Sequence, residues 1–180
     1  FLTNFSATWE PLPPHPKVIV TQTRYVWAAS KAAERYPADT LYQKIAAHGC
    51  QFLLDSMWDS EYGGYYFTLP TSVPDSLQDR ASQVKQSYGN AFAIYALAAY
   101  YHLSQDERAL ERAKKTFYWM EEHVHDPEYG GYFDFSTREG VSKKSDAFNA
   151  DFFAPYTSVA AYKDYNSSIH ILVAFAELHH

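Results

Sequence analysis

Apolar residues recur along most of the chain at the three- and four-residue spacing of amphipathic helices. Proline and capping residues divide this pattern: Pro37 ends the first helical stretch, and Asp39 is a suitable N-cap for the second. The aromatic runs at 65–67 and 132–135 have the composition of short strands. We therefore expect an all-α fold with short strands in its connecting loops. The five helices should cover about 17–36, 39–58, 82–103, a stretch that begins after Ser104 or Asp106 and ends near Val124, and 159–180.

One short segment occurs twice. The sequence DSEYGGY at 59–65 returns 67 residues later as DPEYGGY at 126–132, each copy lying between helical stretches. The paired glycines suit a tight turn with positive φ. A repeat of this length predicts helical hairpins stacked side by side, each unit reading helix, short loop, helix, Gly-Gly turn, strand and long loop.

The first, third and fifth predicted helices align on a lysine. The aligned segments are 17–24, 85–92 and 163–170, and each is followed after four residues by an alanine. We expect these three helices to face the central cavity of a hairpin toroid, and the second and fourth, with their charged faces, to lie outside. The extra length of the last unit falls in a loop from about 137 to 160, which is either a lid or a surface excursion.

Length, charge and cysteine content narrow the function classes. A chain of 180 residues suits one domain, 1–180. The net charge of −6 and the lack of a basic stripe predict that nucleic acid is not a partner. No apolar run is long enough to span a membrane. The single cysteine, Cys50, excludes an internal disulfide and allows a reducing compartment, so we expect a cytoplasmic protein. Aromatic residues make up 18% of the chain, which suits either a sugar-binding cleft or a tyrosine-rich core.

The candidate chemistry lies on the three inner helices, at Arg24, Trp27, Tyr88, Asn166 and His170. A neutral imidazole can move a proton near pH 7, and a guanidinium can hold the oxyanion that forms when a proton leaves carbon beside a carbonyl. Structural roles stay open, because a lone helical histidine is more often structural and Arg24 could pair with a buried carboxylate. The sequence has no convincing metal-ligand spacing and no Gly-rich phosphate loop, so we expect neither a metal nor a cofactor.

Four segments resemble the N-acylglucosamine 2-epimerase superfamily, most closely its cellobiose 2-epimerase branch: 17–27, 85–101, 126–133 and 166–170. The resemblance implies an (α/α)6 barrel of which these residues form about the amino-terminal half, with no cofactor and no metal. It implies a neutral mono- or disaccharide substrate. The reducing-end aldose is opened, deprotonated at C2 to a cis-enediolate and reprotonated on the other face.

The resemblance also implies a role for each candidate. Arg24 would hold the developing oxyanion, and His170 would assist ring opening or shuttle protons between O1 and O2. Tyr88 and Asn166 would bind the sugar, and Trp27 would form part of the wall. In the family two further histidines, the C2 acid and base, stand in later repeats outside these residues, so this fragment alone should be inactive.

The chain departs from the family at one position, and other functions remain open. Many members carry Glu three residues after the helix-five histidine, where this chain has Val173. One alternative is an (α/α)6 glycoside hydrolase or lyase, which for hydrolysis needs paired carboxylates, although Asp164 is the only clear acid on the inner helices. Another is a non-catalytic sugar-binding remnant. Two and a half hairpins would also leave an open apolar edge through which the chain could associate.

Overall fold

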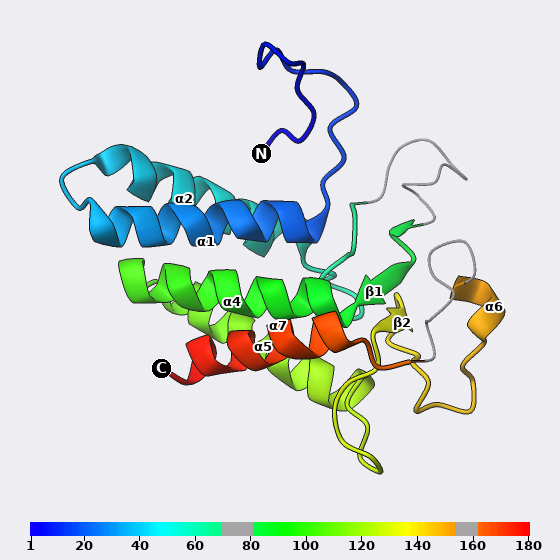
Figure 1. Cartoon of the computed structure of the whole chain (residues 1–180). Helices are drawn as coiled ribbons and strands as arrows, with labels where there is room; N and C mark the ends of the chain where they lie inside the picture. The colour runs from blue at the N-terminus through cyan, green and yellow to red at the C-terminus, as the bar shows by residue number, and fades with distance from the viewer. Residues whose placement is uncertain (70–80, 154–161) are drawn as a thin grey trace.

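The computed structural model describes residues 1–69, 81–153 and 162–180 (Figure 1). Its helices form two hairpins and one further helix, joined by segments with little regular structure. The hairpins are α1 (Ile19–Arg35) with α2 (Thr40–Phe52), and α4 (Ser87–Ser104) with α5 (Glu107–His123); α7 (Tyr165–His179) follows. The shorter elements are a π-helical segment (Leu53–Met57), β1 (Val84–Gln86), β2 (Phe135–Thr137) and α6 (Ala150–Phe153).

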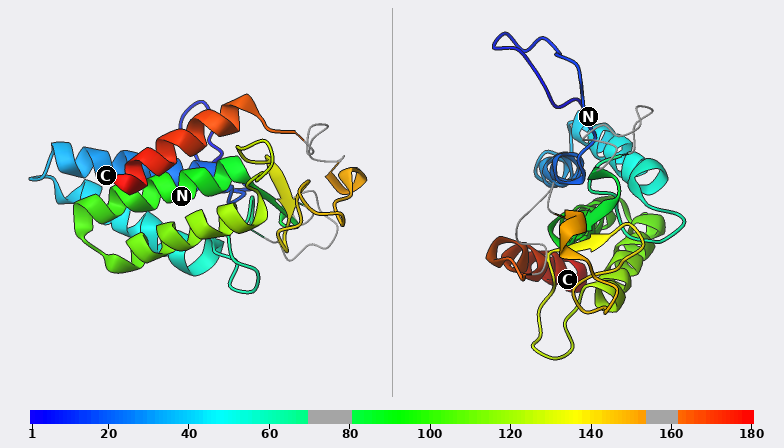
Figure 2. Two further views of the ribbon diagram at one scale, coloured as in Figure 1. Left: turned by 90° about the horizontal axis from the view of Figure 1, so that it is seen from below. Right: turned by 90° about the vertical axis from the view of Figure 1, so that its right-hand side faces the viewer.

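The helices form two layers. α4 packs against α1, α5 and α7, and α1 packs against α2. The right-hand view of Figure 2 looks along the helices and shows α1, α4 and α7 as an arc, with α2 and α5 on its outer side. An ion pair of 2.9 Å between Lys31 and Glu177 also joins α1 to α7. This is the predicted partial (α/α)6 toroid, with α1, α4 and α7 as its inner helices. Within the described residues no helix is long and apolar enough to cross a membrane.

Aspartate side chains begin three of the helices. Asp39 accepts a hydrogen bond of 2.9 Å from the Leu41 amide, and Asp106 and Asp164 cap α5 and α7 in the same way. Each cap satisfies an amide that has no partner within the helix. The N-cap predicted at Asp39 is confirmed, and of the two predicted starts of the fourth helix the structure has the one after Asp106. The Asp164 carboxylate accepts the capping hydrogen bond of α7 and does not face the cavity.

Three predicted helices are shorter at their amino ends than expected, two of them because of strand pairing. β1 pairs antiparallel with β2, so α4 begins at Ser87 and not at 82. Val18 bridges to Thr68, so α1 begins at Ile19 and not at 17. α7 begins at Tyr165 and not at 159; residues 162–164 are not helical, and 159–161 lie outside the described residues.

The predicted aromatic strands are also shorter than expected. The runs at 65–67 and 132–135 contribute isolated bridges, Trp58 to Tyr65 and His125 to Tyr132, and only Phe135 of these runs belongs to a strand. The predicted lid loop over 137–160 is described only as far as 153, where it contains the short helix α6. Its remaining residues lie outside the described part of the chain.

The central helix α4 is buried on nearly every side. Eleven of its 18 residues are buried, mostly alanines and other small or apolar side chains. A Cβ added at Gly89 would lie 2.5 Å from Ile19 Cγ2, so α1 and α4 approach each other closely at this point. Small residues therefore bring the three inner helices near enough for their side chains to share one space.

Each Gly-Gly turn is held by a lysine that stands two residues before the next inner helix. Asp59 and Asp126 each accept hydrogen bonds from the amides two and three residues later. Lys85 Nζ lies 3.0 Å from Asp59 Oδ2 and also donates to the Gly63 carbonyl. Lys163 Nζ lies 2.6 Å from Asp126 Oδ2 and 2.6 Å from the Gly130 carbonyl. The lysines that align in the sequence thus fix α4 and α7 to the turn that precedes each of them.

Candidate functional site

A hollow of about 440 Å³ opens on the concave side of the inner layer. All three inner helices contribute to its wall. The lining residues are Arg24, Trp27 and Ala28 of α1, Phe92 and Tyr95 of α4, and Ile169, His170 and Val173 of α7. Three of the five predicted site residues therefore line it directly, and they come from opposite ends of the chain.

Arg24 and His170 meet around two aromatic rings of α4. Arg24 Nη2 donates a hydrogen bond of 3.0 Å to the Tyr88 hydroxyl. The Tyr88 ring packs edge-on against the His170 imidazole, with centroids 5.0 Å apart. Arg24 Cζ also lies 4.8 Å from the centroid of Phe92, whose ring is 4.8 Å from that of His170. A guanidinium, a phenol and an imidazole thus face one space.

Burial and charge act on His170 in the same direction. Its partial burial lowers the pKa of the imidazole, and the positive charge of Arg24 lowers it further. Both effects favour the neutral ring near pH 7, in which one nitrogen donates and the other accepts. The Tyr88 hydroxyl, which already accepts from Arg24, keeps its own proton to donate to a ligand oxygen.

Trp27 and Tyr95 form an aromatic wall of the hollow. Their rings stack with centroids 5.2 Å apart and an interplanar angle of 18°. Within the described residues the Trp27 indole N–H is buried without a hydrogen-bond partner. Flat aromatic faces of this kind can cover the C–H surface of a sugar ring.

Asn166 and Val173 occupy different positions on α7. Asn166 lies in the first turn and is exposed, and it is not among the residues that line the hollow. It shares a helix face with His170, four residues later, but the structure does not bring it to Arg24 and Tyr88. Val173 lines the hollow and is 41% exposed, so this position presents an apolar surface.

The sequence reasoning missed Phe92 and Tyr95 as site residues. The lysine alignment contained the signal for Phe92, because Arg24, Phe92 and His170 each stand seven residues after the aligned lysine. Residues at one register position of stacked repeats lie side by side. Phe92 was not predicted because its side chain is apolar, although its ring contacts both Arg24 and His170.

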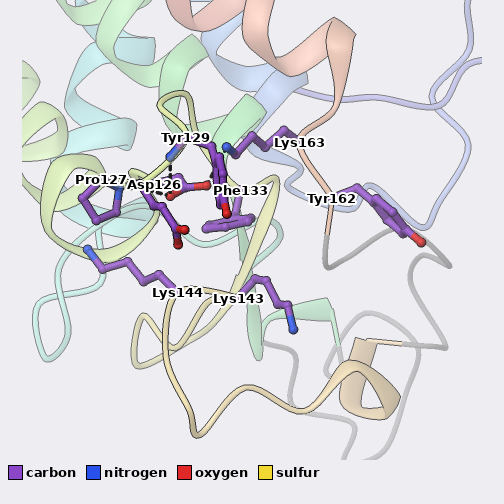
Figure 3. A pocket seen from close by; sticks show the side chains of 9 residues that line it. Asp126, Pro127, Tyr129, Phe133, Lys143, Lys144, Tyr162 and Lys163 are labelled. Atoms are coloured by element: carbon purple, nitrogen blue, oxygen red, sulfur yellow. Dashed lines mark hydrogen bonds and ion pairs between the residues drawn. The ribbon is translucent and has the colours of Figure 1, made fainter.

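A larger hollow, of about 580 Å³, surrounds the second Gly-Gly turn (Figure 3). Asp126 and Lys163 face each other there, and Lys144 donates to the Glu122 carbonyl. These charged groups are engaged in holding the turn and the loop that follows it. The smaller hollow, where Arg24 and His170 converge, is the better candidate for chemistry. Within the described ranges no three His, Cys, Asp or Glu side chains gather as a metal site would need.

Comparisons with known proteins support the same interpretation. The sequence profile of the N-acylglucosamine 2-epimerase (GlcNAc 2-epimerase) family matches residues 1–139. A cellobiose 2-epimerase of Ruminococcus albus is 31% identical over 163 residues, which are 91% of this chain and 38% of that protein. The structure of cellobiose 2-epimerase from Spirochaeta thermophila aligns with a TM-score of 0.73 and 30% identity over 93% of this chain and 39% of its own.

A third similar protein is a sugar epimerase from a ruminal bacterium. Its crystal structure aligns with a TM-score of 0.78 and 27% identity, over 99% of this chain and 42% of its own. The chain thus spans about two fifths of the length of the relatives it matches.

Proposed function

Because the chain belongs to the N-acylglucosamine 2-epimerase family, we propose that the whole protein is a sugar 2-epimerase or aldose–ketose isomerase. It acts at C2 of a reducing-end aldose through ring opening and a cis-enediolate. The observation that carries this proposal is the convergence of Arg24 and His170 on one hollow, with Tyr88 hydrogen-bonded to Arg24 and packed against His170.

Each of the three side chains has a step that suits it. The neutral imidazole of His170 accepts the proton of the anomeric hydroxyl as the ring opens and returns it to the ring oxygen, and later moves a proton between O1 and O2. Arg24 stabilises the negative charge that develops on oxygen when C2 loses its proton. Tyr88, oriented by Arg24, donates to a sugar hydroxyl. By resemblance, the C2 proton transfers themselves fall to histidines of later repeats.

The substrate is a neutral mono- or disaccharide. The relatives named cellobiose 2-epimerases indicate a disaccharide. The stacked rings of Trp27 and Tyr95 offer an apolar face to a pyranose, and Val173 adds no charge to the wall. Asn166 stays a predicted sugar ligand: it is exposed in the first turn of α7, four residues before His170.

Hydrolysis fits the described residues less well. A glycoside hydrolase needs two carboxylates beside the scissile bond. Within the described part of the chain, no carboxylate lines the hollow. Asp164 caps α7. The remaining hypothesis, a sugar-binding remnant without catalysis, is separated from the epimerase by the exchange experiment below.

Other expectations from the sequence stay predictions. They are a cytoplasmic location, the absence of nucleic acid among the partners, a single domain over 1–180, inactivity of this fragment alone, and association through the open edge. Exposed apolar side chains of α7, Leu172 and Ile169, are consistent with such an edge.

Deuterium exchange tests the proposed function. The whole protein is incubated in heavy water with cellobiose, mannobiose, mannose or N-acetylmannosamine, and deuterium at C2 is measured by NMR. We expect incorporation with at least one sugar and a loss of about 10²-fold or more in His170→Asn and in Arg24→Gln. The control His102→Asn changes a histidine outside the hollow, at the carboxyl end of α4, and should exchange normally. Sugar binding without any C2 exchange would favour the binding remnant and reject the epimerase.

A further inference from the structure

We propose that Phe92 is a positioning residue that holds the Arg24 guanidinium and the His170 imidazole beside each other in the hollow. For its catalytic consequence the inference rests on the proposed function. The contacts of Phe92 with Arg24 and His170 do not depend on that function and are tested separately.

The repeat places these three side chains in one row. Arg24, Phe92 and His170 stand seven residues after Lys17, Lys85 and Lys163. Two of these lysines hold the turn that precedes their helix, Lys85 before α4 and Lys163 before α7, so the starts of both helices are anchored in the same way. Phe92 therefore lies between the other two by construction of the repeat.

The ring of Phe92 touches both neighbours with different chemistry. The guanidinium carbon of Arg24 lies 4.8 Å from the ring centroid, within the range of a cation–π interaction. The imidazole of His170 packs against the same residue with centroids 4.8 Å apart and a 41° interplanar angle. Phe92 itself is only 7% exposed and is braced by the Tyr88 ring at 4.9 Å, so it cannot turn aside.

Few other contacts position the two groups. Within the described residues Arg24 makes one hydrogen bond, to Tyr88, and no ion pair, and His170 makes neither. The titratable or charged groups that face His170 from the neighbouring helices are Arg24 of α1 and Tyr88 of α4. Without the Phe92 ring, a flexible arginine held by one hydrogen bond would sample positions farther from the imidazole.

The test replaces the ring while keeping an apolar side chain. In the 180-residue chain, NMR titration of the imidazoles gives the pKa of His170, whose signal is assigned by its loss in His170→Asn. Phe92→Leu should raise that pKa toward its ordinary value of 6.5, because the ring no longer covers the imidazole and Arg24 is no longer held beside it. Phe92→Tyr, which keeps the ring, should leave the pKa unchanged. The matched control is Tyr95→Leu, which removes a ring from the same helix and hollow but not from contact with either group.

Activity of the whole protein gives the second readout. With a sugar that exchanges, Phe92→Leu should lower kcat by about tenfold or more with a smaller change in KM, and Phe92→Tyr should restore most of it. A Phe92→Leu variant with an unchanged His170 pKa and unchanged kcat would overturn the inference and leave the proposed function intact. If the unsubstituted protein exchanges no sugar, the proposed function fails while the pKa comparison still decides the role of Phe92.

A measurement without substitution covers the case in which Phe92→Leu does not fold. In the original chain the ring current of Phe92 should shift the side-chain protons of Arg24 upfield from their random-coil positions. Random-coil shifts for those protons would show that the guanidinium does not rest on the ring, and would overturn the inference.

Discussion

The two Gly-Gly turns share one design but differ in what surrounds them. Each has an aspartate that accepts from two amides, two glycines with φ between 69° and 77°, and a lysine from the next inner helix segment. The first turn is buried: the side chains of Asp59 and Lys85 are 0% exposed. At the second, the side chain of Lys163 is 28% exposed.

Two further residues close the first turn and have no described counterpart at the second. Arg138 donates to both oxygens of Asp59, at 2.8 and 3.1 Å. Trp119 covers Gly63 and Gly64, and its indole N–H donates to the Tyr62 carbonyl at 3.1 Å. Among the described residues, nothing lies within 4 Å of a Cβ placed on Gly130. The same local sequence therefore gives the same turn, whereas its contribution to stability depends on the residues that pack around it.

The largest difference should follow from removing the aspartate charge. Asp59→Asn leaves the buried Lys85 ammonium without its counter-charge and should lower the free energy of unfolding by about 3–5 kcal/mol. Asp126→Asn should cost about 1 kcal/mol, because Lys163 is partly solvated. Urea unfolding followed by circular dichroism measures both, and equal losses would contradict the comparison.

The next largest difference in stability should come from replacing the first glycine of each turn by alanine. Alanine is strained at the positive φ of Gly63 and Gly130 alike, at about 1–2 kcal/mol. At Gly63 the new Cβ would also lie 2.9 Å from Trp119 Cδ1, which adds about 1–3 kcal/mol. Thermal unfolding of Gly63→Ala and Gly130→Ala gives the two values. A Gly130→Ala loss as large as that of Gly63→Ala would show that Trp119 is not what distinguishes the turns.

Acid should weaken the buried turn over a defined range. Burial alone would raise the pKa of Asp59, but the Arg138 hydrogen bond and the Lys85 charge outweigh it and lower the pKa to about 2 from 3.8. Because the folded pKa lies below the unfolded one, this carboxylate stabilises the fold fully above about pH 4. That contribution, about 2 kcal/mol, is lost as the pH falls through 2. Unfolding measured from pH 5 to 2 tests this, and the corresponding part of the slope should disappear in Asp59→Asn.

The smallest effect should come from the lysine of the open turn. Lys163→Met removes an ion pair of which the lysine is partly exposed, so the loss should stay below about 1 kcal/mol. Lys143→Met is the matched control, since this lysine lines the same hollow and contacts only the Phe148 ring among the described residues. A loss of several kcal/mol in Lys163→Met alone would mean that the second turn is as tightly held as the first.

Periodicity and repetition were sufficient to predict the arrangement of the helices. The hairpins, the Gly-Gly turns, the inner and outer helices and the nearness of Arg24 to His170 all follow from local pattern and alignment. The starts of α1 and α4 did not, because Val18 and β1 are held by partners about 50 residues away in the chain.

The predicted site was incomplete for related reasons. Phe92 has no chemistry of its own, so its importance depends on what it touches across helices. The role of the aligned lysines was equally hidden, because Lys85 meets a carbonyl that lies 22 residues earlier. Asn166 shows the converse: a four-residue spacing from His170 fixes its helix face but does not determine which cavity it reaches.

The contacts of Lys85 with the first Gly-Gly turn also fix the rotational register of α4. Seven positions separate Lys85 from Phe92, and each helical residue turns the chain by about 100°. Gaining or losing one amino acid between them would rotate the Phe92 ring out of the space between Arg24 and His170, even if every helix still formed. The interval from Lys85 to Phe92 must therefore keep its number of residues.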